Sequence, residues 1–332
     1  MPITITATNA GFHSLTGTGA PVAPDLFLGG FLDVTGTAGP LGNGETWGID
    51  MPGGWVRLEN VAPLGQAQES VVEVAFDSVH FGRTEDGATV AGGQIALDSP
   101  LRATTLVDLD GRVDTAWIDT IGDALQERVQ HEGLRFVGGT GRDFVDLSDH
   151  PYPIYGEVVL LGRGGDDRLE SGRTDARLAG GNGDDVLSTE GGTSVLRGGR
   201  GDDTISLGVW SEGSRALGGK GADLIQSSNG PDRLAGGRGD DRLEGGRGND
   251  ALNGGHGADM LLGGEGADRF IFNTRQVGED QILDFETDID TLVLRGAQKD
   301  VSVIQDGNDT VISWDAGGVR ILDTTADHFD YL

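Results

Sequence analysis

Aspartate recurs at nine-residue steps through the C-terminal half of the chain, and this spacing is the clearest chemical signal in the sequence. Four nonapeptides run without a gap over residues 236–271: GGRGDDRLE, GGRGNDALN, GGHGADMLL and GGEGADRFI. Further copies begin at Gly138, Gly162, Gly180, Gly198, Gly218 and Ser227. Two nonapeptides, from Ser171 and Thr189, keep the length but lack the acidic sixth residue. One carboxylate and a group of glycines therefore return with each copy of the pattern G-G-x-G-x-D-x-U-x, where U is apolar.

The repeat predicts a turn of six residues followed by a strand of three. Glycine permits positive φ and close backbone approach, so the first six residues can turn tightly with their carbonyl oxygens aimed inward. The middle residue of each strand is apolar and should point into a core. The predicted core side chains are Leu187, Ile205, Ile225, Leu234, Leu243, Leu252, Leu261 and Phe270.

Glycine content alone would be compatible with disorder. The chain of 332 residues holds 59 glycines, and 30 of them lie between residues 162 and 271. The strict nine-residue period favours a regular repeat fold instead.

These nonapeptides resemble the glycine- and aspartate-rich repeats of the RTX (hemolysin-type calcium-binding repeat) family, and the resemblance covers residues 134–271. It implies an all-β protein whose C-terminal part is a parallel β-roll. Two nonapeptides would form one coil of this roll, so turns eighteen residues apart would stack on the same edge. The resemblance also implies a secreted bacterial protein that binds calcium.

Stacked turns would supply oxygen ligands in the number that calcium needs. Ca²⁺ takes six to eight oxygens in a flexible geometry, whereas Mg²⁺ demands a tighter octahedron and softer metals prefer Cys or His. The chain has no cysteine. A single turn cannot provide enough oxygens, but two stacked turns can, through carbonyls and two aspartates. We therefore expect Ca²⁺ as the cofactor, bound between successive turns.

Sorting the turns by eighteen residues predicts two unequal edges. The turns at 162, 180 and 198 share the first edge, which continues at 218, 236 and 254 if the two extra residues in 207–217 form a bulge. The second edge starts with degenerate turns at 171, 189 and 207 and continues at 227, 245 and 263. We expect about five ions on the first edge and about two on the second, about seven in all.

The predicted calcium site consists of sixth-position aspartates and of turn glycines. The aspartates are Asp143, Asp167, Asp185, Asp203, Asp223, Asp232, Asp241, Asp250, Asp259 and Asp268. The glycines are Gly180, Gly183, Gly198, Gly201, Gly218, Gly221, Gly236, Gly239, Gly245, Gly248, Gly254, Gly257, Gly263 and Gly266.

Residues 272–332 are expected to form a C-terminal cap. The segment 270–294 is similar to the capping segment of RTX proteases and lipases, and Gly278, Asp280, Ile282, Asp284 and Phe285 match its G-x-D-x-I-x-D-F element. Thr287 stands where that element continues with glycine. The final DHFDYL is similar to the uncleaved secretion signal of type I (ABC-transporter) substrates. The alternative is that these residues close the apolar end of the cap.

Residues 1–133 form a separate region, predicted to be a small, β-rich, sandwich-like domain of unknown role. The run 71–81 alternates, Asp110-Gly111 marks a turn, and 123–130 is typical of a short helix. No catalytic motif is present: H-E-x-x-H is missing, and G-x-S-x-G fails around Ser14. The sequence therefore favours a protein that is not an enzyme.

Charge and the N-terminus bear on partners and location. The formal net charge is -30, which favours cations and disfavours nucleic acid as a partner. Residues 1–10 have neither the basic nor the apolar region of a Sec signal peptide, and no apolar run approaches membrane-spanning length. We therefore expect an extracellular protein exported by the type I machinery, without a membrane span.

Three functional hypotheses remain open from the sequence, of which one is a fragment or accessory chain whose roll serves only secretion. The first is a non-enzymatic, secreted calcium-binding protein with an adhesive or surface-associated role, whose partner is an extracellular glycan or a cell surface. The alternative is an RTX-type extracellular enzyme, such as a polysaccharide-modifying one, with an active site in residues 1–130 that no motif reveals. A carboxylate pocket there would favour the enzyme, and an aromatic patch from Trp47, Trp55 and Trp117 would favour sugar binding.

Overall fold

The computed structural model describes residues 130–148, 154–211, 213–296 and 301–329, and in the first 129 residues it describes the backbone of seven strands. The chain divides into two compact units, Met1–Arg163 and Gly164–Leu332. Nearly all described elements are strands, so the predicted all-β class is confirmed. Within the described residues, no helix is long and apolar enough to cross a membrane.

The first unit is β-rich, as predicted. Its strands are β1 (Ile3–Ala7), β2 (Gly39–Leu41), β3 (Thr46–Met51), β4 (Gly54–Glu59), β5 (Ala62–Pro63), β6 (Val71–Glu85), β7 (Ala88–Leu106), β8 (Leu134–Val137), β9 (Phe144–Asp146) and β10 (Val158–Gly164). Strands β2-β3-β4-β6-β7-β1 pair antiparallel in this order, and β5 pairs with β6. Strand β1 then pairs parallel with β8, and β8 with β10. The long β6–β7 hairpin contains the alternating run 71–81.

Several expectations for this unit fall outside the described residues. They are the sandwich-like side-chain packing, the turn at 110–111, the tryptophan patch and most of the helix over 123–130. Residues 130–132 are helical and lead into β8.

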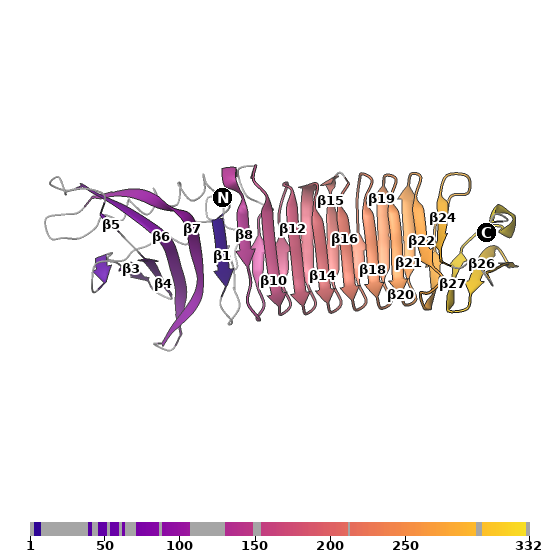
Figure 1. Ribbon diagram of the computed structural model, residues 1–332, viewed down its shortest axis with the longest axis horizontal. Helices are drawn as coiled ribbons and strands as arrows, with labels where there is room; N and C mark the ends of the chain where they lie inside the picture. Colours follow the sequence, from indigo (N-terminus) through magenta and orange to yellow (C-terminus); the bar gives the residue numbers. More distant parts are fainter. Residues whose placement is uncertain are drawn as a thin grey trace. The chain divides into compact units, whose positions relative to one another are not determined.

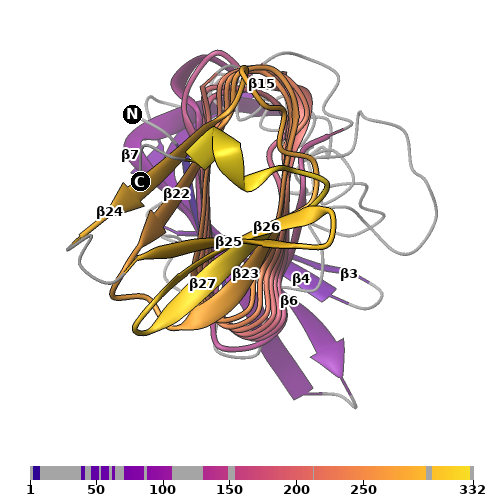
Figure 2. The same ribbon diagram turned by 90° about the vertical axis from the view of Figure 1, so that its right-hand side faces the viewer.

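The second unit contains a parallel β-roll of two sheets (Figures 1 and 2). The first sheet consists of β12 (Ala176–Asn182), β14 (Val195–Arg200), β16 (Arg215–Lys220), β18 (Arg233–Arg238), β20 (Ala251–His256), β22 (Arg269–Asn273) and β24 (Thr291–Arg295). The second sheet contains β11 (Arg168–Glu170), β13 (Val186–Gly192), β15 (Thr204–Ser211), β17 (Leu224–Gln226), β19 (Arg242–Arg247), β21 (Met260–Glu265) and β23 (Gly278–Ile282). Chain-consecutive strands alternate between the sheets, so each coil uses two nonapeptides, as predicted.

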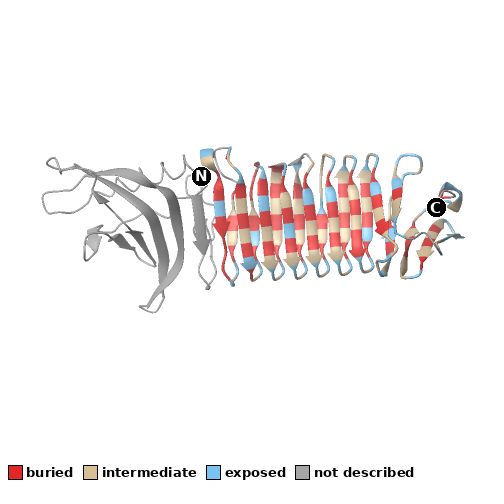
Figure 3. Ribbon diagram, viewed as in Figure 1, coloured by how far each residue is buried: buried red, intermediate tan, exposed pale blue. Residues whose placement is uncertain are grey.

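The core lies between the two sheets and is built from the eighth residue of each repeat. All eight predicted core side chains are buried, with at most 2% exposure (Figure 3). They stack in register along each sheet, as in the pairs Leu187↔Ile205 and Leu234↔Leu252. Full burial of such a side chain stabilises the fold by roughly 1.5–3 kcal/mol. This apolar column therefore holds the turns of successive coils in register.

One of the two extra residues in 207–217 forms the predicted bulge in β15, and the other lies between Ser211 and Arg215. Strand β15 pairs with β13 at Thr189↔Leu207 and again at Gly191↔Trp210, with a register shift between them. The coils on either side remain stacked, because Thr204 still pairs with Leu224. The insertion therefore leaves the edges continuous.

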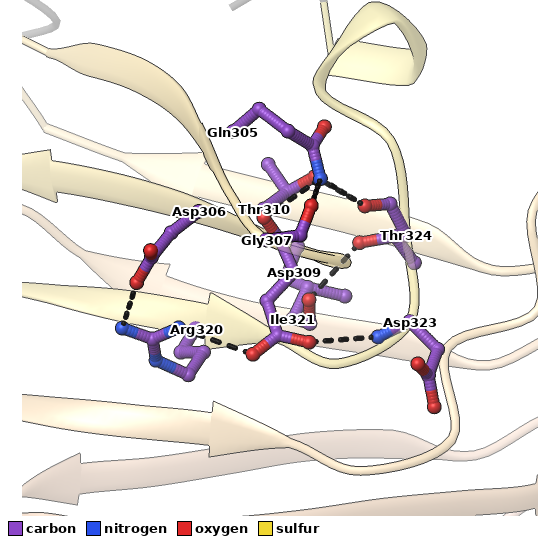
Figure 4. Close-up of polar contacts among 9 residues, drawn as sticks. All are labelled: Gln305, Asp306, Gly307, Asp309, Thr310, Arg320, Ile321, Asp323 and Thr324. Carbon is purple, nitrogen blue, oxygen red and sulfur yellow. Dashed lines mark hydrogen bonds and ion pairs between the residues drawn. The ribbon is translucent and has the colours of Figure 1, made fainter.

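The cap closes the roll with a small antiparallel meander. Strand β27 (Gly317–Ile321) pairs parallel with β23 and antiparallel with β26 (Asp309–Trp314), and β26 pairs with β25 (Ser302–Asp306). The Gln305 amide donates to the carbonyl oxygens of Gly307, Asp309 and Thr324 (Figure 4).

An aromatic contact completes the cap. The short 3-10 helix η2 (Ala326–Phe329) buries Phe329, whose ring lies 5.5 Å from that of Phe285. Part of the terminal DHFDYL segment thus packs in the cap, and residues 330–332 lie outside the described part of the chain.

Candidate metal centre

The sixth-position aspartates of the first edge form a continuous hydrogen-bonded column. The Oδ1 atom of each aspartate accepts a hydrogen bond from the backbone N–H of the aspartate one coil earlier. These bonds measure 2.8–2.9 Å and run through Asp167, Asp185, Asp203, Asp223, Asp241 and Asp259. The bond from Asp203 to Asp223 spans 20 residues rather than 18, so the column crosses the bulge without interruption. The structure thus places these aspartates on one edge, in the order that the sequence predicts.

The second edge has the same column, but its upstream half is neutral. Asp250 Oδ1 accepts from the Asp232 N–H at 2.7 Å, and Asp268 Oδ1 from the Asp250 N–H at 2.8 Å. Before Asp232, serine hydroxyls take this place: the Ser194 Oγ accepts from Ala176 at 3.1 Å, and the Ser214 Oγ from Ser194 at 3.0 Å. The acidic part of this edge therefore begins at Asp232, where the sequence places it.

The Oδ2 atoms of the sixth-position aspartates are the atoms that indicate a cation site. Seven Oδ2 atoms are buried and have no hydrogen-bond partner within the described residues: those of Asp185, Asp203, Asp223, Asp241, Asp250, Asp259 and Asp268. An isolated buried carboxylate is strongly unfavourable unless a cation compensates it. Each of these aspartates thus uses one oxygen for the backbone and leaves the other available for a cation.

The surroundings of these aspartates raise the pKa values of their carboxyl groups. Burial, with added repulsion from neighbouring carboxylates, raises the pKa of Asp241 to about 8 and the pKa values of Asp203 and Asp250 to about 7. The same causes raise the pKa values of Asp185, Asp223 and Asp268 to about 6. An adjacent cation would favour the ionised form and offset this repulsion.

The first-position glycines leave room for the free oxygens. A Cβ at Gly236 would collide with Asp241 Oδ2 and lie 2.6 Å from the carbonyl oxygen of Gly254. A Cβ at Gly245 would lie 2.6 Å from both Asp250 Oδ2 and the Gly263 carbonyl oxygen. A carboxylate oxygen and a carbonyl oxygen of the next coil therefore converge beside each of these two glycines.

The fourth-position glycines allow the coils to stack closely. Their φ values lie between 119° and 148°, a region that side chains disfavour. They are Gly183, Gly201, Gly221, Gly239, Gly248, Gly257 and Gly266. At Gly239 a Cβ would overlap the carbonyl oxygen of Gly221 on the preceding coil. Both glycine positions in the predicted site thus have a steric reason.

This donor set fits calcium. Within the described residues, no group of three or more acidic or histidine side chains could hold a metal. At these edges the oxygens that converge are a carboxylate oxygen and a backbone carbonyl oxygen of the next coil. Such all-oxygen, backbone-rich coordination suits a hard cation with a flexible, high coordination number.

Two predicted aspartates differ from the others. Asp143 Oδ2 accepts a hydrogen bond from the Gly139 N–H at 3.0 Å. Asp232 Oδ2 accepts one from the hydroxyl of Ser227, which stands where most repeats have their first glycine. Protein donors therefore already satisfy these two carboxylates.

The cap adds two aspartates to these columns that were not among the predicted calcium ligands. Asp259 donates its N–H to Asp280 Oδ1 at 3.0 Å, and Asp268 donates to Asp290 Oδ1 at 2.9 Å. Burial raises the pKa values of both Asp280 and Asp290. The two columns thus end on cap residues that lie 21 and 22 residues after their partners, outside the eighteen-residue period.

Asp284 binds the backbone next to the second column. Its two oxygens accept hydrogen bonds from the N–H groups of Gly263 and Gly264, both at 2.9 Å. The match to the G-x-D-x-I-x-D-F element contained Asp280 and Asp284, and it was the one sequence signal for them.

Comparison with known proteins agrees with this geometry. A family model of four copies of the RTX calcium-binding nonapeptide repeat matches residues 179–209, 217–252 and 236–270. Among solved structures, the extracellular lipase LipA from Serratia marcescens is similar over 57% of this chain and 39% of the lipase chain, with 18% sequence identity and a TM-score of 0.29. The similar region is thus well under two thirds of the lipase, and no match was found among curated proteins. The matched residues contain the aspartates of both edges from Asp185 to Asp268, so this part of the chain consists of RTX calcium-binding nonapeptide repeats.

Proposed function

We propose that this chain is an extracellular calcium-binding protein whose β-roll folds when calcium occupies the two aspartate edges. The observation that carries the proposal is the set of seven buried Oδ2 atoms without a hydrogen-bond partner in the described residues. Folding brings these like charges into columns, so the folded state needs a cation that the unfolded chain does not need.

The ligands would be the Oδ2 atoms and the turn carbonyls of successive coils. About seven ions would occupy the intervals between the aspartates predicted from the repeats. Asp280 and Asp290 extend each edge by one interval, so the count can exceed that number. Asp143 and Asp232 would contribute least, because protein donors already satisfy their carboxylates.

Calcium dependence favours a place outside the cell. Extracellular calcium modules bind at about 10⁻⁴–10⁻³ M, so such a roll would stay unfolded in a low-calcium cytosol. It would fold after export, for which the type I machinery, which passes unfolded chains, is the candidate route.

The proposed division of labour has three parts. Residues 1–133 would carry a non-enzymatic, adhesive or surface-associated function, 134–271 the calcium-dependent roll and 272–332 the cap. The alternative is an extracellular polysaccharide-modifying enzyme with its active site in the first part. A glycan array and a hydrolase screen with the full chain in calcium distinguish them, because turnover of any glycan would refute the non-enzymatic role.

The folding proposal is tested by circular dichroism of the full chain. In chelator at pH 7.5 we expect the β signal of the roll to be missing, and millimolar Ca²⁺ should restore it cooperatively. The same concentration of Mg²⁺ should restore much less, because its octahedral demand fits these carbonyl-rich turns poorly. A full β signal in chelator would refute calcium-dependent folding.

A further inference from the structure

The outer face of the first sheet is basic, although the chain as a whole is strongly acidic. The six strands β12, β14, β16, β18, β20 and β22 contain no aspartate or glutamate. They carry arginines and one lysine that point outward and are exposed. We call the outward surface of these six strands the basic face.

Strand register aligns these cations into columns along the roll. In the seventh-residue column, Arg215 pairs directly with Arg233, and Arg269 follows two strands later. In the third-residue column, Arg200, Lys220 and Arg238 lie on three neighbouring strands. Neighbouring strands are about 4.8 Å apart, so the three cations of the third-residue column and the pair Arg215 and Arg233 repeat positive charge at this short spacing. Val195 and Ala251 interrupt the seventh-residue column.

The opposite sheet shows that this arrangement is not a general property of the roll. There Arg242 pairs with Glu244 at 2.6 Å and Arg247 with Glu265 at 3.3 Å. Within the described residues, no ion pair joins Arg215, Arg233 or Arg269 to an acid. These three arginines of the basic face are therefore available to a partner.

With calcium bound to the buried aspartates, the remaining charges of the roll would favour an anion at the basic face. Residues 164–271 hold 19 acidic and 12 basic residues, and nine of the acids are the buried sixth-position aspartates. Removing those nine leaves ten acids against 12 bases in this stretch of the sequence. The seventh-residue column also borders the second edge, where the fifth-position residues Pro231, Asn249 and Ala267 are uncharged.

Acidic residues lie closer to the third-residue column than to the seventh-residue arginines Arg215, Arg233 and Arg269. Asp202 and Asp240 occupy exposed turns two residues beyond Arg200 and Arg238, and each accepts a backbone hydrogen bond from the next coil. The seventh-residue column is therefore the stronger part of the basic face.

We propose that the basic face binds a linear anionic polysaccharide that lies along the roll. Rows of cations that follow one another along a sheet suit an extended polymer with one carboxylate or sulfate per repeating unit. The outward residues of the six strands include no phenylalanine, tyrosine or tryptophan on which bases could stack, which disfavours single-stranded nucleic acid. The outward apolar residues Val195, Leu217 and Ile271 are only partly exposed and lie on three separate strands, which disfavours insertion into a membrane.

The test measures binding of the full chain in millimolar calcium to chondroitin sulfate and to hyaluronan, which present sulfate and carboxylate groups or carboxylate groups alone. Neutral dextran, a thymidine oligonucleotide and anionic lipid vesicles serve as the competing partners. The double variant Arg215→Gln/Arg233→Gln removes two charges from the basic face. Its matched control, Arg242→Gln/Arg247→Gln, removes two charges from the opposite sheet.

We expect the wild type to bind at least one of the two anionic polysaccharides and not dextran. The basic-face variant should lose roughly tenfold in affinity, and its salt dependence should become shallower by up to about two charges, while the control changes less than about twofold. Circular dichroism in calcium should be the same for all three proteins. Binding to neither polysaccharide, equal loss in both variants, or tighter binding to the oligonucleotide or the vesicles would each overturn the proposal.

Discussion

Replacing Asp241 by asparagine should change the stability of the roll in opposite directions with and without calcium. Asp241 lies in the middle of the first edge, where its Oδ1 accepts the Asp223 N–H at 2.8 Å and its Oδ2 has no partner among the described residues. Asparagine keeps the Oδ1 acceptor and the shape of the side chain. It removes the charge and places an amide where a calcium ligand would be.

The size of the stability change without calcium follows from the pKa of the Asp241 carboxyl. Burial and the charges of Asp259 and Asp223 raise it from 3.8 to about 8. At pH 7 the carboxyl is ionised in the unfolded chain and must take up a proton when the chain folds. The interval of about three pH units between the unfolded pKa and pH 7 costs on the order of 4 kcal/mol of folding free energy, at ~1.4 kcal/mol per unit. The buried amide of asparagine forfeits about 1–3 kcal/mol instead. Without calcium, Asp241→Asn should therefore stabilise the roll by roughly 1–3 kcal/mol.

With calcium bound, the same change removes a charged partner from a buried ion. Loss of one partner of a buried charge pair typically destabilises by about 3–5 kcal/mol. We expect Asp241→Asn to lower the urea midpoint in saturating calcium by a corresponding amount and to reduce the cooperativity of calcium-induced folding. In chelator, it should fold at a lower concentration of a stabilising osmolyte than the wild type does.

Asp240→Asn is the matched control, since it removes the same charge from the neighbouring residue. Asp240 is exposed and accepts the Ala258 N–H at 2.8 Å, a bond that asparagine can also accept. Its effect should be smaller than that of Asp241→Asn under both conditions, because the charge of Asp240 is the smallest of the causes that raise the pKa of Asp241. Equal effects of the two variants, or destabilisation by Asp241→Asn in chelator, would contradict the assignment of a metal role to the buried carboxylate.

Two further predictions concern protons and glycine. The folded-state pKa values of Asp203, Asp241 and Asp250 are raised to about 7–8. The calcium-free roll should therefore be most stable below the unfolded pKa near 3.8 and should lose that stability as the pH rises through 7–8. Circular dichroism in chelator from pH 4 to pH 8.5 checks this, and β content that increases with pH would contradict it. Gly239→Ala should prevent calcium-induced folding of the surrounding coils, because its φ is +119° and the carbonyl oxygen of Gly221 occupies the place of the added Cβ. The control Gly307→Ala in the cap has a φ of +67° and open space around it. It should lower the free energy of unfolding in urea by only about 1 kcal/mol.

The repeat made the roll predictable in detail. A fixed period places each residue type at one point of the coil, so the division into two edges, the bulge in 207–217 and the buried eighth residues followed from counting. The cap was not predictable in this way, because Asp280 and Asp290 reach their columns through connections longer than eighteen residues. Their position depends on how β23 and β24 pair with the last coils.

Substitutions within the period were also difficult to interpret. Serine at the sixth position indicates a lost ligand, and only the structure shows that the Ser194 Oγ replaces the backbone bond of the missing carboxylate. Likewise, Ser227 in place of glycine indicates a worn repeat, but its hydroxyl satisfies Asp232. These effects depend on contacts between coils, which a one-dimensional pattern does not contain.

In the proposed mechanism, the two oxygens of each aspartate make folding of the roll depend on an ion. Oδ1 is held by the backbone of the preceding coil, so stacking the coils necessarily stacks the carboxylates. Like charges about 4.8 Å apart repel by about 3 kcal/mol at an effective dielectric constant of 20, and each interior aspartate has two such neighbours. The neutral Ser194–Ser214 stretch makes the same backbone bonds without this repulsion. A divalent cation between the turns converts the repulsion of the acidic stretches into attraction, so calcium acts at the interface between neighbouring coils, which in a solenoid is where cooperativity arises.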